Sequence, residues 1–600
     1  MKKNSVAIIA SVASLGLLIS GTTNAAAADK PIYMTVHPTA TSAATMTPWA
    51  TAGDVVGGKT VAGVPDGMGA YANKDGTISV LSNHEIALTD TTLTSNDFGV
   101  RTTRAWGGTG AFVTKFTVKP STMQVTKVEE AIKKINWYNY ENGKYQSTPQ
   151  GPAAAPDTDS FTAQNHSENL NRLCSAYLAP AGALVSGKKG WKTPLFFTGE
   201  EGGDESRVFV LDPLTSVAYQ APRLGLAAWE NAVVVSNTGD DTVVFGTEDG
   251  DDGIGSASVS PATASSADLA KGSQVFLYRG TKTSTGTFMD RAGLNNGYLS
   301  VMAIDGPVVG TRVVDETQFR TLHPIKGTKV PVTFKEINWA ADGETQNIQA
   351  RLKGTSLGSP EDLAVNPENK NEVYFVTKSS GIPTTGVTGP ASQTASKKAD
   401  ASANARDGGG LWKLTFVDIA RPQDGATIEL VLDGSETPNL YMIDNIDFDS
   451  TGRYIMIQED AGRNNHLSRL VAYDTVLKKL AVVAQFVETY FTPTIPGTYM
   501  TNDEESSGII NVTKLLVDVN TSGLGETFLL NAQVHPASRV LGGTTLIVNA
   551  ENAIAKETAK LRPDLTFADS DAEVAFKTKV IEGGQFYKLS ITDWSKLIWQ

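Results

Sequence analysis

The stretch Ile443-Asp444-Asn445-Ile446-Asp447-Phe448-Asp449-Ser450-Thr451-Gly452-Arg453-Tyr454-Ile455-Met456-Ile457-Gln458-Glu459-Asp460 contains two short apolar strands joined by a turn. We expect Gly452 to supply the positive φ of that turn and Asp449 to accept hydrogen bonds from its backbone. The first strand carries Asp444 near its start, and the second strand runs into Glu459-Asp460. The stretch therefore predicts a β-hairpin with acidic residues at one end.

The same combination of an apolar strand and an acidic end recurs along the chain. Many short strands separated by turn signals, with little helix, indicate an all-β architecture. A β-propeller explains both the length of 600 residues and the repeated acidic ends, because the innermost strands of a propeller surround one axis. We therefore expect the acidic ends to converge on a shared site. A set of unrelated surface hairpins with solvated acids is the alternative.

The termini and two insertions complete the expected organisation. Residues 1–28 are predicted to be a secretory signal peptide, with Lys2-Lys3 before an apolar stretch and a small-residue cleavage site. Residues 29–600 are predicted to form a single propeller domain, with low-complexity insertions near 254–272 and 379–409. One short helix is possible at Lys127 to Lys134. No later apolar run is long enough for a membrane helix, so we expect a secreted or periplasmic protein.

Composition narrows the possible functions. The formal net charge of −13 argues against nucleic acid as a partner. Cys174 is the only cysteine, which rules out an intrachain disulfide and a thiolate-rich metal site. We interpret Cys174 as a small buried residue. The six histidines are not clustered, which argues against zinc.

Carboxylates beside strand ends are the candidate metal ligands. Many carboxylates around one axis repel each other unless cations neutralise them. Oxygen ligands with variable spacing suit Ca²⁺, which accepts six to eight of them. The sequence therefore predicts calcium as the metal.

A set of short motifs resembles the PhoX-type alkaline phosphatases, and more closely a less characterised secreted branch of that superfamily. The motifs follow one another in the family's order over residues 60–536. They are Pro65-Asp66-Gly67-Met68-Gly69-Ala70, Ser82-Asn83-His84-Glu85, Arg172-Leu173-Cys174-Ser175, Thr198-Gly199-Glu200-Glu201, Trp229-Glu230-Asn231, Gly246-Thr247-Glu248-Asp249-Gly250, Pro360-Glu361-Asp362, Asp444-Asn445-Ile446, Gln458-Glu459-Asp460 and Glu504-Glu505-Ser506-Ser507-Gly508-Ile509.

The resemblance implies a propeller of about six blades that hydrolyses phosphate esters at a central metal cluster. That cluster contains calcium throughout the family and iron in the well-understood members. By this resemblance the metal ligands are Glu85, Glu200, Glu230, Glu361 and Glu459, followed by Asp362 and Asp444.

Two departures from the family pattern bear on the chemistry. The iron-containing members have a cysteine where this chain has Gly199, which argues against iron. The family's arginine before Pro-Glu, expected to hold the substrate phosphate, is Ser359 here, so a bidentate donor is missing. Arg172, Arg207, Arg453 and Arg463 are candidate substitutes.

Three functions remain open at this point. The leading hypothesis is a calcium-dependent phosphoesterase of the alkaline-phosphatase type that acts on a small phosphate ester. The second is a non-catalytic, calcium-stabilised propeller that binds a ligand or a surface. The third is another hydrolase on the same scaffold, similar to a lactonase.

Overall fold

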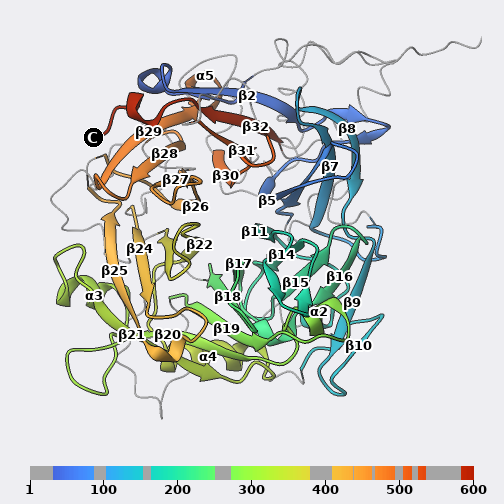
Figure 1. Cartoon of the computed structure of the whole chain (residues 1–600), viewed down its shortest axis with the longest axis vertical. Helices are drawn as coiled ribbons and strands as arrows, with labels where there is room; N and C mark the ends of the chain where they lie inside the picture. The colour runs from blue at the N-terminus through green and yellow to red at the C-terminus, as the bar shows by residue number, and fades with distance from the viewer. Residues whose placement is uncertain are drawn as a thin grey trace, which may run out of the picture.

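Six blades of mostly antiparallel strands surround a central axis and form a β-propeller (Figure 1). This computed structural model describes residues 32–86, 103–152, 164–250, 272–378, 408–436, 438–461, 466–492, 504–516, 525–534 and 583–600. Within these ranges each blade has four strands or more. The predicted all-β propeller with about six blades is confirmed.

The strands of the first three blades run outward from the axis. Blade 1 contains β5 (Pro65–Ala72), β6 (Ile78–His84), β7 (Phe112–Lys119) and β8 (Gln124–Glu130); blade 2 contains β11 (Leu173–Ala179), β14 (Leu195–Glu200), β15 (Val208–Asp212), β16 (Val217–Gln220), β9 (Lys134–Asn139) and β10 (Lys144–Gln146); blade 3 contains β17 (Trp229–Val235), β18 (Asp241–Glu248), β19 (Val275–Thr281), β20 (Tyr298–Ile304) and β21 (Val330–Ile337).

The other three blades follow the same order. Blade 4 contains β22 (Pro360–Val365), β23 (Glu372–Thr377), β24 (Gly410–Phe416) and β25 (Ala426–Asp433); blade 5 contains β26 (Ile443–Phe448), β27 (Tyr454–Glu459), β28 (Arg469–Asp474), β29 (Lys479–Phe486) and β1 (Met34–Val36); blade 6 contains β30 (Glu504–Asn511), β31 (Glu526–Val534), β32 (Gly583–Ile591) and β2 (Ala44–Thr51). Strands β21 and β25 pair at their outer edges, which joins blades 3 and 4 into one nine-stranded sheet.

Short elements decorate this ring. They are the hairpins β3 (Val55–Val56) with β4 (Lys59–Thr60) and β12 (Leu184–Ser186) with β13 (Lys189–Trp191), and the helices α2 (Phe288–Arg291), α3 (Glu316–Leu322), α4 (Gly343–Lys353) and α5 (Glu488–Phe491). Within the described ranges, no helix is long and apolar enough to cross a membrane.

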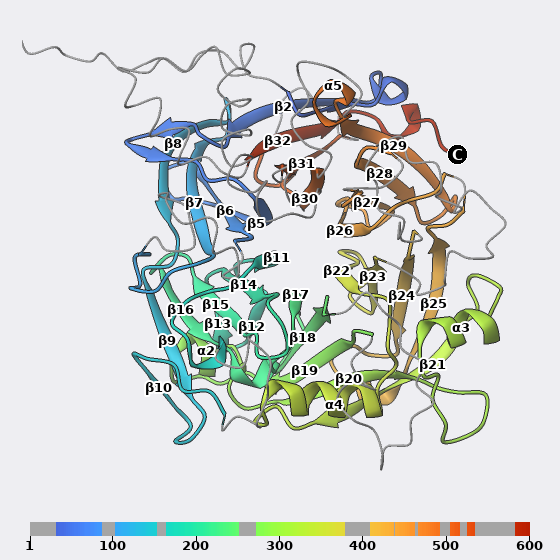
Figure 2. The same ribbon diagram turned by 180° about the vertical axis from the view of Figure 1, so that it is seen from behind.

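The innermost strands form a closed circuit around the axis. In ring order β5, β11, β17, β22, β26 and β30 each contact the next, and β30 contacts β5. Figure 2 shows the same ring from behind. The register of the circuit brings equivalent positions of all six blades to the same level.

Apolar contacts between neighbouring blades hold the ring together. Each of the six blade interfaces contains one buried apolar cluster. Phe116 and Phe586 lie between blades 1 and 6, with ring centroids 5.1 Å apart, and Tyr374 and Phe448 lie between blades 4 and 5. A blade packed on both faces needs apolar side chains at successive positions, which explains continuous runs such as 232–235.

Both ends of the described chain contribute to ring closure. The N-terminal strand β2 pairs with β32, near the C-terminus, from Ala44↔Ile591 to Thr51↔Gln585. The N-terminal strand β1 pairs with β29 and completes blade 5. Two blades are therefore composite, and the ring closes by hydrogen bonds between segments far apart in the sequence.

The hairpin predicted at 443–460 is confirmed as β26 and β27. Gly452 has φ 68°, and Asp449 Oδ1 accepts hydrogen bonds from the backbone N–H groups of Arg453 and Tyr454 at 2.9 Å each. The possible helix at Lys127 to Lys134 is wrong, because this segment ends β8 and begins β9. The buried residues Val125 and Val128 of β8 are three positions apart, because the register between β7 and β8 shifts there.

Three predictions fall outside the described residues entirely or almost so. They are the signal peptide at 1–28 and the insertions near 254–272 and 379–409. These remain predictions.

One hydroxyl anchors the first described strand to blade 6. Tyr587 Oη accepts hydrogen bonds from the backbone N–H groups of Tyr33 and Met34, at 3.0 and 2.8 Å. We expect Tyr587→Phe to lower the free energy of unfolding by about 1–3 kcal/mol, because the N–H of Met34 loses its acceptor, whereas the N–H of Tyr33 keeps Gln585 Oε1. Urea unfolding measures this loss. Tyr298→Phe is the control, since Tyr298 is exposed and its change should be neutral; equal stability of the two variants would contradict the anchoring role.

Candidate metal centre

The second residue of every innermost strand lies at the same end of the axis. These residues are Asp66, Cys174, Glu230, Glu361, Asp444 and Glu505. In five of the six blades a β-bulge follows directly, because the register with the second strand shifts just after the first residue. Bulges re-aim side chains beside active sites, and here they turn four acids and one thiol toward one place.

A second position in each hairpin adds to this set. In blades 1 to 5, the residue that follows the second strand donates its backbone N–H to the carbonyl of the residue that precedes the first strand, at 2.8–3.1 Å. The donors are Glu85, Glu201, Asp249, Lys378 and Asp460. The acceptor residues Val64, Arg172, Ser359 and Met442 all have positive φ, between 40° and 52°. The shared geometry places one more side chain per blade at the axis.

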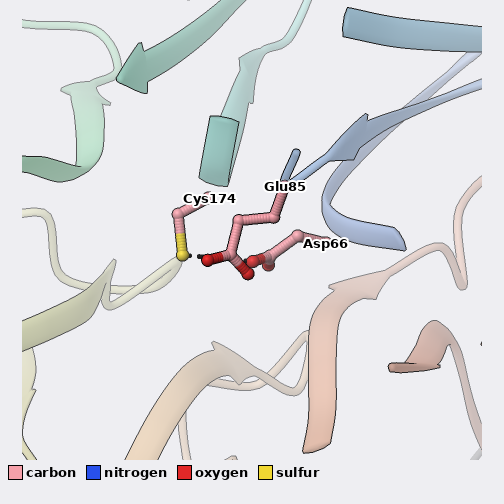
Figure 3. A group of neighbouring side chains, drawn as sticks. All are labelled: Asp66, Glu85 and Cys174. Carbon is pink, nitrogen blue, oxygen red and sulfur yellow. Dashed lines mark hydrogen bonds between the residues drawn. The ribbon is translucent and has the colours of Figure 1, made fainter. Parts of the chain in front are cut away.

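Three groups of potential ligand atoms result, and they are linked to each other. Asp66, Glu85 and Cys174 form the first group (Figure 3), Cys174, Glu201 and Glu230 the second, and Glu230, Glu361 and Asp444 the third. Within each group the ligand atoms lie within 4.8 Å of one another. Because Cys174 and Glu230 are each shared, the groups form a continuous row from blade 1 to blade 5.

Burial makes this row electrostatically costly without a cation. The pKa of Asp66 is raised well above its ordinary value by burial first, and then by repulsion from Glu505, Glu85 and Glu230. Burial and neighbouring acids also raise the pKa values of Glu201, Glu361 and Asp444. The Oε2 atom of Glu230 is buried and has no hydrogen-bond partner among the described residues. A bound cation would satisfy that oxygen and neutralise the carboxylates.

Two basic side chains accompany the acids. Arg172 pairs with Glu85 and, at 3.0 Å, with Glu201, while its side chain remains 41% exposed. Lys378 Nζ lies 2.8 Å from Glu361 Oε1, 3.3 Å from Asp249 Oδ2 and 3.8 Å from Asp460 Oδ2. The centre therefore contains two basic side chains, and the exposure of Arg172 shows that the centre reaches solvent.

A polar layer beneath the acids fixes their orientation. Ser175 Oγ donates to Glu230 Oε1 and accepts from Asn445 Nδ2. Asp362, predicted as a ligand, lies in this layer. Its carboxylate accepts from Asn231 Nδ2 at 2.6 Å and from the backbone N–H of Ile446 at 3.1 Å, and burial raises its pKa to about 8. Asp362 thus ties β22 to both neighbouring innermost strands.

The structure does not bring Glu200 into the three groups. Glu200 Oε2 accepts from Arg207 Nε at 2.7 Å and Oε1 from Arg207 Nη2 at 2.9 Å, and both side chains are 0% exposed. Glu200 also accepts the backbone N–H of Arg207, which begins the next segment of the blade. Its carboxylate is fully engaged in the blade interior.

Glu459 has the equivalent arrangement in blade 5. It accepts two hydrogen bonds from the Arg469 guanidinium, at 2.8 and 2.9 Å, and contacts His466 Nε2 at 3.0 Å. Burial alone would raise the pKa of Glu459, but Arg469 and His466 lower it to about 2. The ligand roles of Glu200 and Glu459 remain predictions that this placement does not favour, whereas Glu85, Glu230, Glu361 and Asp444 lie in the row.

One thiol lies at the centre, although the family's cysteine position is Gly199 in this chain. Cys174 Sγ belongs to two of the three groups and donates to Asp66 Oδ2 at 3.1 Å. No side chain fits at position 199 as the chain stands, because a Cβ on Gly199 would lie 2.4 Å from Trp229 Cβ in the next blade. The centre therefore has its thiol at another position, and the expectation against iron stays a prediction.

The predicted ligand set lacks seven residues of the centre: Asp66, Cys174, Glu201, Asp249, Lys378, Asp460 and Glu505. A signal was present, because each innermost strand begins with one residue followed by an acid or a thiol, as in Pro65-Asp66, Leu173-Cys174 and Glu504-Glu505. Aligning the six strand starts would have placed Cys174 among the acids.

The chain was compared with known proteins. No protein-family profile and no curated protein matches its sequence. Among solved structures, Pseudomonas fluorescens PhoX in complex with vanadate, a transition state analogue, has a TM-score of 0.52 at 12% identity and covers 94% of this chain and 97% of that chain. This likeness shows a PhoX-like fold.

Two further structures are more distant. The α-L-arabinofuranosidase Arb93A from Fusarium graminearum has a TM-score of 0.31 at 8% identity and covers 78% of this chain and 88% of that chain. The periplasmic gluconolactonase PpgL from Pseudomonas aeruginosa has a TM-score of 0.30 at 9% identity and covers 78% of this chain and 80% of that chain.

We expect Glu200→Gln to act on stability. Removing one charge of a fully buried ion pair leaves Arg207 uncompensated, which costs about 3–5 kcal/mol. Guanidinium unfolding measures the loss. Asp240→Asn is the control, because Asp240 pairs with Lys189 at the surface and its change should cost at most about 1 kcal/mol. A Glu200 variant as stable as this control would contradict the structural role.

We expect the protein stripped of divalent ions to lose stability as the pH rises above 4.5, the ordinary pKa of a glutamate. Asp66, Glu201, Glu230, Glu361 and Asp444 all have raised pKa values in the folded chain. The unfolded chain therefore releases these protons first, and each such group lowers the free energy of unfolding by about 1.4 kcal/mol per pH unit until its folded pKa is passed. Denaturant unfolding between pH 4.5 and 8 tests this. A flat or rising profile would contradict it, and saturating calcium should flatten the fall.

Proposed function

We propose that the chain is a secreted, metal-dependent hydrolase that cleaves small phosphate esters, with calcium as its principal metal. The observation that carries this proposal is the row of buried carboxylates and one thiol beside an exposed arginine. The PhoX-like fold supports it, because the solved PhoX structure contains vanadate as a transition state analogue. The sequence motifs from Pro65 to Ile509 resemble those of the same superfamily.

The donor atoms fit a bound metal. Glu230, Glu361 and Asp444 offer only oxygen, which is the ligand set that calcium prefers. The group around Cys174 mixes a thiol with carboxylates and suits a softer transition metal such as iron. The unpartnered Oε2 of Glu230 supports a ligand role for the residue that links the two ends.

A bound metal would supply Lewis acidity for a phosphoryl oxygen and would lower the pKa of a water molecule. The chain's own residues do the rest. Ser175 and the polar layer hold Glu230, and the bulges hold the acids at the second strand positions. Asp362 keeps three innermost strands in register. These contacts preorganise the donors, so that little rearrangement is needed on binding.

Arg172 is the candidate residue for binding the phosphate. Its guanidinium lies at the centre and is 41% exposed, so it can form charge-assisted hydrogen bonds to an anion. Two other arginines suggested by the sequence lie elsewhere. Arg207 is fully buried with Glu200, and Arg453 pairs with Asp474 at the far end of the β26–β27 hairpin. Arg463 lies outside the described residues.

The proposal predicts that Glu361→Gln loses both metal and turnover. We expect the variant to hold fewer metal ions per chain and to lose at least about 100-fold in kcat/KM, because a ligand shared with the row is replaced by a weaker donor. Metal content by mass spectrometry, and hydrolysis of a generic phosphomonoester and phosphodiester with and without a calcium chelator, measure these effects.

Glu368→Gln is the matched control, because Glu368 is exposed in the turn at the opposite end of the same β22–β23 hairpin. It should match the wild type in both assays. Wild-type metal content in Glu361→Gln would remove Glu361 from the ligand set. A folded wild-type protein that binds calcium but hydrolyses neither ester would refute the phosphoesterase and favour a non-catalytic, calcium-stabilised propeller. Hydrolysis of a lactone alone would favour the third hypothesis.

A further inference from the structure

One position of the ring carries the opposite charge to its equivalents. In blades 1 to 5, the residue after the second strand is Glu85, Glu201, Asp249, Lys378 or Asp460. Four of these five are carboxylates, and blade 4 alone among the described blades has a lysine. The backbone geometry is the same in all five, because each donates its N–H to the residue before the first strand. The lysine therefore reverses the charge at this position and leaves the backbone geometry the same.

The lysine ammonium lies where three blades present carboxylates. Lys378 Nζ is 2.8 Å from Glu361 of its own blade, 3.3 Å from Asp249 of blade 3 and 3.8 Å from Asp460 of blade 5. Its side chain is only 12% exposed. An ammonium has three N–H donors and no acceptor, and two of these carboxylates, Glu361 and Asp249, lie within hydrogen-bond distance, while Asp460 forms a longer ion pair.

This arrangement is that of a cation site already filled. Calcium takes oxygen ligands at about 2.3–2.6 Å, so the three carboxylates would need to move inward by about 0.2–1.5 Å to bind it. The low exposure of Lys378 and its contacts with three carboxylates argue against it as a phosphate ligand. The half-exposed Arg172 lies at the other side of the row, next to Glu85 and Glu201.

We infer that Lys378 is a built-in cation that takes the place of one divalent ion between Asp249, Glu361 and Asp460, so that metal ions bind only along the remaining row from Asp66 to Asp444. The inference rests on the proposed metal centre and deepens it. It restricts the metals to the part of the centre that contains Cys174, Glu230 and Arg172. Lys378 acts as a positioning residue, since it orients Glu361, which is shared between the ammonium and the row.

Counting metal ions tests the inference without any assay of turnover. Chains of the wild type, Lys378→Met, Lys378→Arg and Lys370→Met are saturated with calcium chloride, separated from free ion and analysed by mass spectrometry. We expect Lys378→Met to retain one more calcium ion per chain than the wild type, because three facing carboxylates lose their counter-charge. Lys378→Arg keeps the charge and should match the wild type. Lys370→Met is the matched control, since Lys370 is exposed at the opposite end of the same hairpin.

The dependence of the variant's stability on calcium is a second test of the inference. If a divalent ion can replace the ammonium, Lys378→Met folds in calcium and its thermal midpoint rises more steeply with calcium concentration than that of the wild type. A Lys378→Met chain that stays unfolded at every calcium concentration, while Lys378→Arg folds, overturns the inference. So does a folded Lys378→Met chain with the wild-type number of ions.

The outcomes separate this inference from the proposed function. If the wild type binds calcium and hydrolyses no phosphate ester, and Lys378→Met binds one more ion, the inference holds and the phosphoesterase proposal is rejected. If the wild type hydrolyses phosphate esters and Lys378→Met binds the same number of ions, only the inference is rejected. If neither protein binds metal, both are rejected.

Discussion

One backbone hydrogen bond, repeated from blade to blade, sets up the candidate metal centre. It joins the residue after the second strand to the carbonyl before the first strand, and it closes the axial end of each hairpin. With the bulge that follows, it presents two side chains per blade at a common level. In the five blades that have it, this geometry accounts for four acids and a thiol on the innermost strands. It also accounts for four acids and a lysine that follow the second strands.

The main cost of this arrangement is the burial of like charge. Burial and mutual repulsion raise the pKa values of Asp66, Glu361 and Asp444 together. The blades meet this cost in different ways. Arg207 and Arg469 neutralise the acids that face the blade interior, Lys378 neutralises three that face the axis, and the remaining row is the part suited to metal. Within that row Arg172 and Lys378 pair with Glu85, Glu201 and Glu361, so acids still outnumber basic side chains there.

The sequence predicted the fold better than it predicted the members of the site. Alternation, turn residues and acidic strand ends were enough for a propeller, and the resemblance to the PhoX-type family implied about six blades. They could not decide which member of Glu200-Glu201 or Glu459-Asp460 faces the axis. In a strand, adjacent side chains point to opposite sides, so the assignment depends on the exact last paired residue and on the bulge opposite it. Neither is visible without the register.

Partners distant in the sequence were also out of reach. Cys174 read as a small core residue because no other cysteine or histidine stood near it, and its acidic neighbours come from other blades. The arginines at the start of the following strands were a usable clue. Arg207 and Arg469 follow Glu200 and Glu459 within one hairpin, and an acid paired in that way is removed from the site.

The composite blades have a consequence for the order of events during synthesis. Strand β2 is among the first segments made, and its partner β32 is among the last. A nascent chain can pack early blades against one another, but the ring cannot close until β32 has been synthesised and can pair with β2. Until then β2 presents an open edge, and contacts of such long sequence separation form slowly. Ring closure therefore pairs a strand that is made early with one that is made late.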